Sequence, residues 1–196
     1  MDDSGLIGRV LRASTTGYAC GMRGSEITTP YFGAFVYTEH DESLRIIGLI
    51  YAIRIDDDPL VRQLIMANNL TTAAIRDQRE NRMIPVEISI VNIGYQVRGD
   101  IYQALPPRPP LSLDPVYLCD ADTVIAFTEN ADFFRLILNT SEVPAEELLA
   151  AAVKNAALAR HEREQRDFLV RSGRRLAQLL SGDLPRLNHL LRLIKP

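Results

Sequence analysis

Cysteine, histidine and lysine are scarce in this chain of 196 residues, and their scarcity narrows the kinds of site that it can hold. The two cysteines, Cys20 and Cys119, lie 99 positions apart without a C-x-x-C spacing, and we expect two reduced thiols in the core. The three histidines, His40, His161 and His189, show no metal-ligand spacing with cysteine or with one another. We therefore expect neither a metal site nor a cofactor.

Long apolar runs are missing as well. No stretch approaches the roughly 20 apolar residues that a helix needs to cross a bilayer, so we expect no membrane among the partners. The opening residues, MDDSGLIGR, are acidic and lack the basic and then apolar layout of a signal peptide, which predicts a cytoplasmic protein. With 46% hydrophobic and 24% charged residues, the composition is typical of a globular chain that holds one domain and an appendage.

Strings that mark common catalytic sites do not occur either. Neither G-x-S-x-G nor H-E-x-x-H is present, and the acidic residues are scattered, apart from the run at 56–58. Asp58 can cap a helix that starts at Pro59, whereas divalent-ion loops interleave carboxylates with glycine and backbone ligands. We expect no enzyme activity. A metal-dependent nuclease built from distant carboxylates stays open as a further hypothesis.

The most informative stretch that the sequence does contain is 33–55. Two apolar runs, 34–37 and 46–55, flank the polar turn 40–43, and this arrangement predicts a hairpin. The second run has apolar side chains at both odd and even positions, as expected for a strand that is buried on both faces. Gly48, in its middle, allows a bend or a close backbone approach. A small closed barrel needs such bends, so we take the hairpin as the centre of one.

Other short runs supply the remaining strands and the connections. They predict an α+β fold: a small six-stranded β-barrel with inserted short helices, followed by an α-helical C-terminal extension. We expect the helical insertion at about 58–81, and we expect 97–105 to close the sheet. The proline-rich segment 106–110 is either a strap that leaves the barrel or a ligand for an SH3-type groove. We favour the strap, because nothing around it looks disordered.

Three stretches occur in an order and spacing that point to a known family. They are I-G-R-V-L-R-A-S-T-T at 7–16, G-A-F-V-x(9)-I-I-G-L-I-Y at 33–51 and P-P-R-P-P-x(4)-P-V-Y-L-C-D-A-D at 106–122. Together they resemble the amino-terminal barrel of HerA-type DNA translocases, a module shared with the catalytic subunits of rotary ATP synthases and called the HAS barrel. The resemblance covers about residues 5–122. It implies a barrel that crowns a ring-shaped assembly and docks a partner nuclease.

The chain departs from that family because it lacks the motor. In the family the barrel precedes a RecA-like ATPase, whose phosphate-binding loop needs G-x-x-x-x-G-K followed by serine or threonine. No such string occurs here, and neither Lys154 nor Lys195 follows a glycine. The 74 residues after Asp122 are also too few for a RecA-like domain. We therefore do not expect translocase activity.

The carboxy-terminal part of the chain differs from the rest in charge and in pattern. Residues 150–196 hold ten basic and four acidic residues, whereas the whole chain has a net charge of −3. A helical pattern opens at Pro144 and, if it were continuous to Ser181, would span about 57 Å at roughly 1.5 Å per residue. Its middle, 161–167, is fully polar and cannot be core. We therefore expect this helix to project and to meet a partner.

A last helix restarts after Gly182 and Asp183, with an apolar stripe at 3-4-3 spacing and arginines around it. Three interpretations remain open: the helix folds back on its own domain, binds a partner protein or another protomer, or touches nucleic acid or an anionic surface. The candidate partner-binding residues are Leu184, Leu187, Leu191 and Ile194. The candidate nucleic-acid-binding residues are Arg171, Arg174, Arg175, Arg186 and Arg192.

These observations predict two parts, a HAS-like barrel with its strap in 1–122 and a helical extension in 123–196. The expected function is that of a non-catalytic oligomerisation or docking protein that serves a DNA-processing ATPase or nuclease, as in DNA repair. We expect a homo-oligomer or a protein partner, such as a ring ATPase or a nuclease. The alternative is a nucleic-acid-binding protein that uses the basic C-terminal helices.

Overall fold

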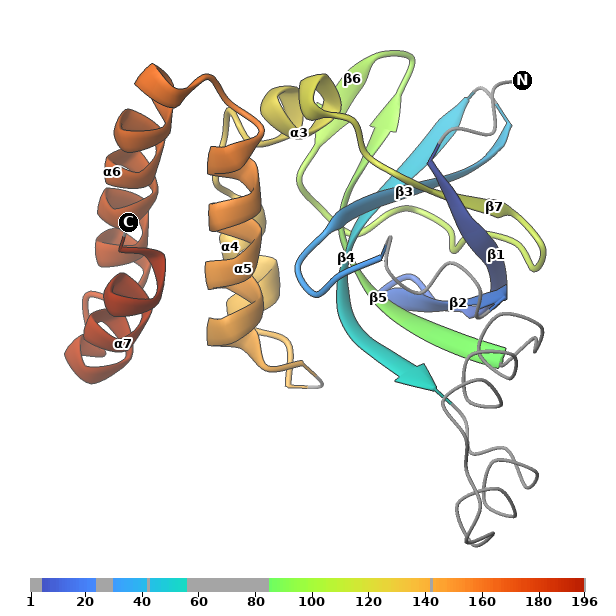
Figure 1. Ribbon diagram of the computed structural model, residues 1–196, viewed down its shortest axis with the longest axis horizontal. Coiled ribbons are helices and arrows are strands. Elements are labelled where there is room, and N and C mark those ends of the chain that lie inside the picture. Colours follow the sequence, from blue (N-terminus) through green and yellow to red (C-terminus); the bar gives the residue numbers. More distant parts are fainter. Residues whose placement is uncertain (1–4, 24–29, 42, 56–84, 142, 196) are drawn as a thin grey trace, which may run out of the picture.

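Strands form a barrel in the first part of the chain, and helices pack against one side of it (Figure 1). The structure is a computed structural model, and it describes residues 5–23, 30–41, 43–55, 85–141 and 143–195. The predicted helical insertion at about 58–81 lies outside the described residues. The strands are β1 (Leu6–Ala13), β2 (Gly17–Arg23), β3 (Phe35–Asp41), β4 (Leu44–Ile55), β5 (Pro85–Val97), β6 (Asp100–Tyr102) and β7 (Pro115–Leu118). The helices are α3 (Ala121–Phe127), α4 (Phe133–Leu138), α5 (Ala145–Leu158), α6 (Glu162–Leu179) and α7 (Leu184–Ile194).

Six of the strands close into an antiparallel ring, which confirms the predicted six-stranded barrel with C-terminal helices. The strands follow one another in the order β2, β1, β7, β3, β4, β5, and pairing of β2 with β5 closes the ring. The prediction that 97–105 closes the sheet is wrong. In that segment β6 has only three residues and extends the sheet beyond β5, outside the ring. Strand β7, which follows the proline segment, is the sixth barrel strand instead.

Strand β4 is buried on both faces, as its sequence predicts. Ile50 belongs to the interior of the barrel, whereas Ile47 and Leu49 pack into a core on the outside. Gly48 lies at a register shift between β4 and β5, where an added Cβ would come within 2.4 Å of Cγ2 of Ile90. The missing side chain therefore permits the close approach of the two strands. The buried interior residues of the barrel are Ile7, Val10, Tyr18, Cys20, Ala34, Val36, Ile50, Val86, Ile88, Ile90 and Val116.

The outer face of β3, β4 and β5 forms a second core with the helices. The ring of Phe35 on β3 makes edge-to-face contacts with Phe127 and Phe133, at centroid distances of 6.3 and 6.2 Å. Helix α5 adds a side of small residues, including Ala152 and Ala156, which lets it approach closely. Among the described buried residues of this core, none comes from β1, β2 or β7. The described helices thus cover one side of the barrel, and none of them covers the β1–β2–β7 side (Figure 1).

The proline segment 106–110 packs along the barrel. Pro106 and Pro110 are buried, and the end of the segment lines a small hollow together with Thr38 of β3 and Ile46 of β4. Beyond the segment, the hydroxyl of Thr38 donates a hydrogen bond to the carbonyl of Pro115 at 2.8 Å. These contacts favour the strap over an exposed ligand for an SH3-type groove.

The carboxy-terminal helices fold back on one another, so the prediction of one long projecting helix is wrong. The pattern that opens at Pro144 breaks at 159–161, and α6 returns alongside α5 (Figure 1). The polar stretch that follows this corner lies at the surface at the start of α6. Helix α7 begins after Asp183, whose side chain accepts a hydrogen bond from the backbone N–H of Arg186, and it packs on α5 and α6. Within the described ranges, every helix is too short or too polar to cross a membrane.

Candidate interaction surfaces

The apolar stripe of α7 is divided between the core and the surface. Leu187 and Ile194 are 8% and 4% exposed and lie with Leu190 in the core shared with α5 and α6. Leu184 and Leu191 are 62% and 36% exposed. The helix therefore folds back on its own chain, as one of the three interpretations expects. Only Leu184 and Leu191 of the candidate partner-binding residues remain available to a partner.

The candidate nucleic-acid-binding arginines do not form one free basic surface. Arg175 forms an ion pair with Asp132, at 2.7 Å from Nη2 to Oδ1. Arg186 pairs with Glu146 of α5. Two of the five side chains therefore have carboxylate partners in their own chain. The three that are exposed and have no ion pair with another described residue are Arg171, Arg174 and Arg192.

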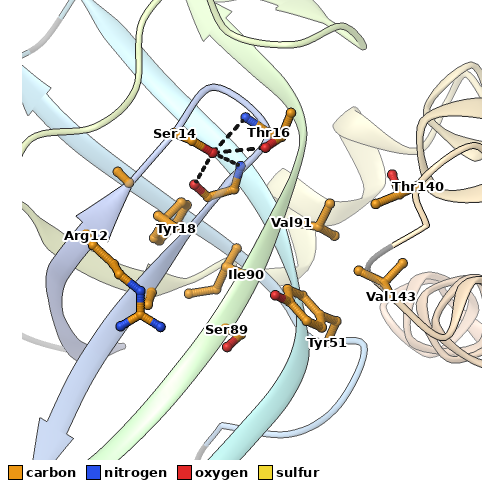
Figure 2. Close-up of a pocket in the computed structure, with 13 residues that line it drawn as sticks. Arg12, Ser14, Thr16, Tyr18, Tyr51, Ser89, Ile90, Val91, Thr140 and Val143 are labelled. Carbon is orange, nitrogen blue, oxygen red and sulfur yellow. Dashed lines mark hydrogen bonds between the residues drawn. The ribbon is translucent and has the colours of Figure 1, made fainter.

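A groove of about 300 Å³ lies where the β1–β2 turn faces the connection between α4 and α5. Figure 2 shows Ser14 and Thr16 of the turn on one side, Thr140 and Val143 on the other, and Val91 of β5 between them. A second hollow of about 350 Å³ adjoins it and shares Thr16, Val91 and Thr140. The groove thus runs along the junction of barrel and helices.

Hydrogen bonds within the β1–β2 turn fix this end of the barrel. The Oγ of Ser14 accepts from the backbone N–H groups of Thr16 and Gly17, both at 3.2 Å, and lies 2.9 Å from the Thr16 hydroxyl. Asn92, buried on β5, donates from Nδ2 to the carbonyl of Thr15 at 3.0 Å. The Ser14 hydroxyl therefore has a structural role and is not held for a reacting group.

The charge at the groove is paired. Arg12 makes a double hydrogen bond to the carboxylate of Glu87, at 2.7 and 2.6 Å, and this bond lowers the pKa of Glu87 below its usual value. No histidine or carboxylate is among the described residues that line the groove. In the described ranges, no three histidine, cysteine or acidic side chains gather where they could hold a metal ion.

The two cysteines do not add a reactive group. Both are free thiols; Cys20 is buried and Cys119 is half-buried. Burial raises the pKa of each to about 12, so both remain protonated near neutral pH. This agrees with the expectation of two reduced core thiols.

Sequence reasoning missed a group of exposed leucines on the uncovered side of the barrel. Leu111 and Leu113, in the connection before β7, are 52% and 70% exposed, and Leu11 of β1 is 51% exposed. The backbone of Leu113 has a φ of +71°, in the left-handed region that bulky residues rarely adopt. We call residues 111–114 the leucine turn. A leucine gives no signal of positive φ, so the sequence offered no means of finding it.

Three hydrogen bonds fix the leucine turn on β1, and two more lie within the turn. Leu113 donates its N–H to the carbonyl of Val10 at 2.8 Å, and the N–H of Val10 donates to the carbonyl of Asp114 at 2.9 Å. The guanidinium of Arg9 donates to the carbonyl of Leu113 at 2.9 Å. Leu111 and Asp114 bond to each other twice, through the Asp114 carboxylate at 2.7 Å and through backbone atoms at 3.2 Å. These bonds thus fix the backbone from which the exposed leucine side chains project.

Comparison with known proteins adds no relative to these observations. No protein-family model matches the chain, and no curated protein matches it.

Proposed function

We propose that this chain is a non-catalytic oligomerisation and docking protein that serves a DNA-processing ATPase or nuclease in the cytoplasm. The leucine turn is the observation that carries the proposal. The resemblance of residues 5–122 to the HAS barrel supplies the class of partner, because that barrel is a docking module. The β1–β2–β7 side of the barrel, which no described helix covers, supplies the surface.

The energetics of the leucine turn support a role in binding. A left-handed backbone costs a residue other than glycine about 1–2 kcal/mol, and an exposed leucine recovers little of this cost by burial. Two hydrogen bonds of the Leu113 backbone, with Val10 and Arg9, and three more in the surrounding turn nevertheless hold Leu113 in this conformation. Strained residues that the surrounding structure fixes in this way cluster at binding sites. Burial of the leucine side chains against a partner would offset the cost of the left-handed backbone.

Replacement of Leu113 with asparagine tests this role. Asparagine tolerates the left-handed region, so we expect the free energy of unfolding to stay within about 1 kcal/mol of the wild-type value. We expect binding of the ATPase or nuclease to be lost, because the most exposed apolar side chain of the turn is gone. Size-exclusion chromatography with light scattering measures this, for the chain alone and with ATPases and nucleases encoded by neighbouring genes.

Leu158→Asn is the matched control, since Leu158 is 72% exposed at the end of α5, away from the barrel surface. It should leave association unchanged. If Leu113→Asn and Leu158→Asn associate equally well, the leucine turn is not the binding surface. A strictly monomeric wild-type chain that binds none of the candidate ATPases or nucleases contradicts the proposal as a whole.

Nucleic-acid binding is the second candidate function, and the exposed arginines without carboxylate partners favour it. Arg171→Glu with Arg174→Glu should weaken binding to duplex DNA. The negative slope of log K against log salt should become shallower by about 2, since each phosphate contact contributes about 0.9 to its magnitude. Arg54→Glu with Arg135→Glu makes the same change of charge on β4 and α4 and serves as the control. Binding that is independent of salt, or an equal loss in both double variants, excludes this function.

A further inference from the structure

The exposed side of α7 combines apolar and basic residues in one stripe. Leu184 and Leu191 are its apolar members, and Arg192 and Lys195 are its charged members. These positions share one side of the helix at spacings of three, four and seven residues. An open hollow of about 640 Å³ follows the stripe. We call this surface the α7 face; its residues are Leu184, Pro185, Asn188, Leu191, Arg192 and Lys195.

The carboxylates that α7 meets in its own chain lie on another side of the helix. Glu146 pairs with Arg186, and Glu147 lies 3.8 Å from His189, both at the side that packs on α5. No described carboxylate forms an ion pair with Arg192 or Lys195. The α7 face therefore carries two positive charges beside its leucines that no described carboxylate neutralises.

A second surface has the opposite charge around an apolar centre. Ile101 and Tyr102 of β6 are 36% and 45% exposed, and the outer edge of β6 pairs with no described strand. The side chain of Gln103 donates to the carbonyls of Phe127 and Asn130 at 2.6 and 3.0 Å, which fixes the end of α3 beside β6. We call this surface the β6–α3 face; its residues are Asp100, Ile101, Tyr102, Asp122, Ala126 and Glu129, all exposed.

The two faces complement each other in charge and in apolar content. Glu129 lies 3.9 Å from Arg160, but Asp100 and Asp122 still outnumber the basic neighbour in the β5–β6 turn, Arg98, so the β6–α3 face is negative overall. An apolar centre with a charged rim is the ordinary composition of a protein interface, in which the rim sets the choice of partner and the centre supplies affinity. Figure 1 places β6 and α3 beside the upper part of the barrel and α7 in the outer layer of helices, far from them. They can therefore meet only between two chains.

We infer that the α7 face of one chain binds the β6–α3 face of a second copy. The contact joins two different surfaces, so it is heterologous and builds a ring or a filament unless two copies exchange the contact mutually. This inference rests on the proposed function, since it names the surfaces through which an oligomerisation protein would associate. It leaves the leucine turn free for the ATPase or nuclease.

Reversal of charge on each face tests the contact in the full-length chain. One variant carries Arg192→Glu and Lys195→Glu, and the other carries Asp100→Lys and Asp122→Lys. Each should weaken self-association by at least about tenfold in sedimentation equilibrium, because like charges then face each other. An equal mixture of the two variants should associate again, since the reversed faces complement each other. Arg163→Glu with Arg166→Glu, near the start of α6, is the control and should change nothing.

The outcomes separate this inference from the proposed function. A wild-type chain that stays monomeric at every concentration overturns the inference. Charge reversals that act no differently from the control, or a mixture that does not associate, overturn it as well. If the monomer still binds an ATPase or nuclease through Leu113, the proposed function stands and the inference alone fails. If the chain associates and Leu113→Asn, but neither charge reversal, abolishes association, the contact lies at the leucine turn instead.

Discussion

Replacement of Gly33 with alanine is expected to lower the free energy of unfolding by about 3 kcal/mol, from backbone strain and overpacking together. Gly33 precedes β3 and has a φ of +78°, so any side chain there is strained. An added Cβ would also come within 2.5 Å of the Cβ of Ala151 and 3.1 Å of its carbonyl carbon, both on α5. Because one of these atoms belongs to the helix backbone, α5 itself would have to move.

Movement of α5 would be costly because Gly33 joins the barrel to the helices. Its N–H donates to the carbonyl of Ile50 on β4 at 2.8 Å. Its carbonyl accepts from Nδ2 of Asn155 on α5, also at 2.8 Å. A displaced helix breaks the second bond and opens the core between β3 and α5. Urea unfolding monitored by circular dichroism measures the loss.

Two other glycines separate strain from overpacking. Gly99, in the β5–β6 turn, has a φ of +95° with no atom within 4 Å of an added Cβ, so Gly99→Ala should cost only the strain of about 1–2 kcal/mol. Gly182 has open space as well and no positive φ, so Gly182→Ala should leave stability nearly unchanged. If Gly33→Ala and Gly99→Ala lower the free energy of unfolding equally, overpacking against α5 does not contribute to the loss at Gly33. Ala151→Gly removes the side chain that an added Cβ at Gly33 would meet. Combined with Gly33→Ala it should restore part of the lost unfolding free energy, and combined with Gly99→Ala it should restore little.

The barrel could be predicted because the order of apolar and polar residues along a strand shows which of its faces are buried. In β4 the run 46–55 is apolar on both sides, and the structure gives each side a core. Gly48 marks a place where β4 and β5 approach closely. These signals are local, so the sequence carries them without knowledge of which strands are neighbours.

Ring closure could not be predicted, because it depends on pairing between distant segments. Alternation shows which side of a strand is buried but does not name its partner. The run 97–105 follows β5 directly and therefore looked like the next barrel strand, yet only β6 forms there, on the outside. The short apolar run 116–119 predicts a strand, and β7 forms there, but nothing in the run shows that it lies between β1 and β3. The predicted boundary between 122 and 123 stays a prediction, since barrel and helices share one core.

The corner between α5 and α6 could not be predicted from local signals either. Neither glycine nor proline occurs at 159–161, where the chain reverses. The polar stretch that starts there is compatible with a projecting helix as well as with the exposed first turns of a returning one. What fixes the corner is a buried arginine, and arginine is almost never fully buried unless it is paired. Sequence reasoning therefore places such a residue at the surface.

Replacement of that residue, Arg160, with methionine is expected to cost about 3 kcal/mol of unfolding free energy, since it removes a buried, hydrogen-bonded charge. Arg160 is 5% exposed and lies between α5 and α6. Its guanidinium donates to the carbonyl of Ala156 at 2.7 Å and to the hydroxyl of Thr128, just after α3, at 2.8 Å. It also lies 3.8 Å from the ring centroid of Phe168 on α6. One side chain thus connects three helices.

Methionine preserves the apolar stem of the side chain, so the loss reports on the charged head group. Burial lowers the pKa of Arg160, and nearby Glu129 opposes this shift, so the guanidinium stays charged at neutral pH and its contribution should not vary with pH near 7. Arg163→Met is the matched control, because Arg163 is exposed on α6, and it should cost less than about 0.5 kcal/mol. Arg160→Lys should fall between the two, since lysine keeps the charge but lacks the planar fork. If Arg160→Met proves no more destabilising than Arg163→Met, the guanidinium does not hold the corner, and packing of α5 on α6 alone accounts for the reversal of the chain.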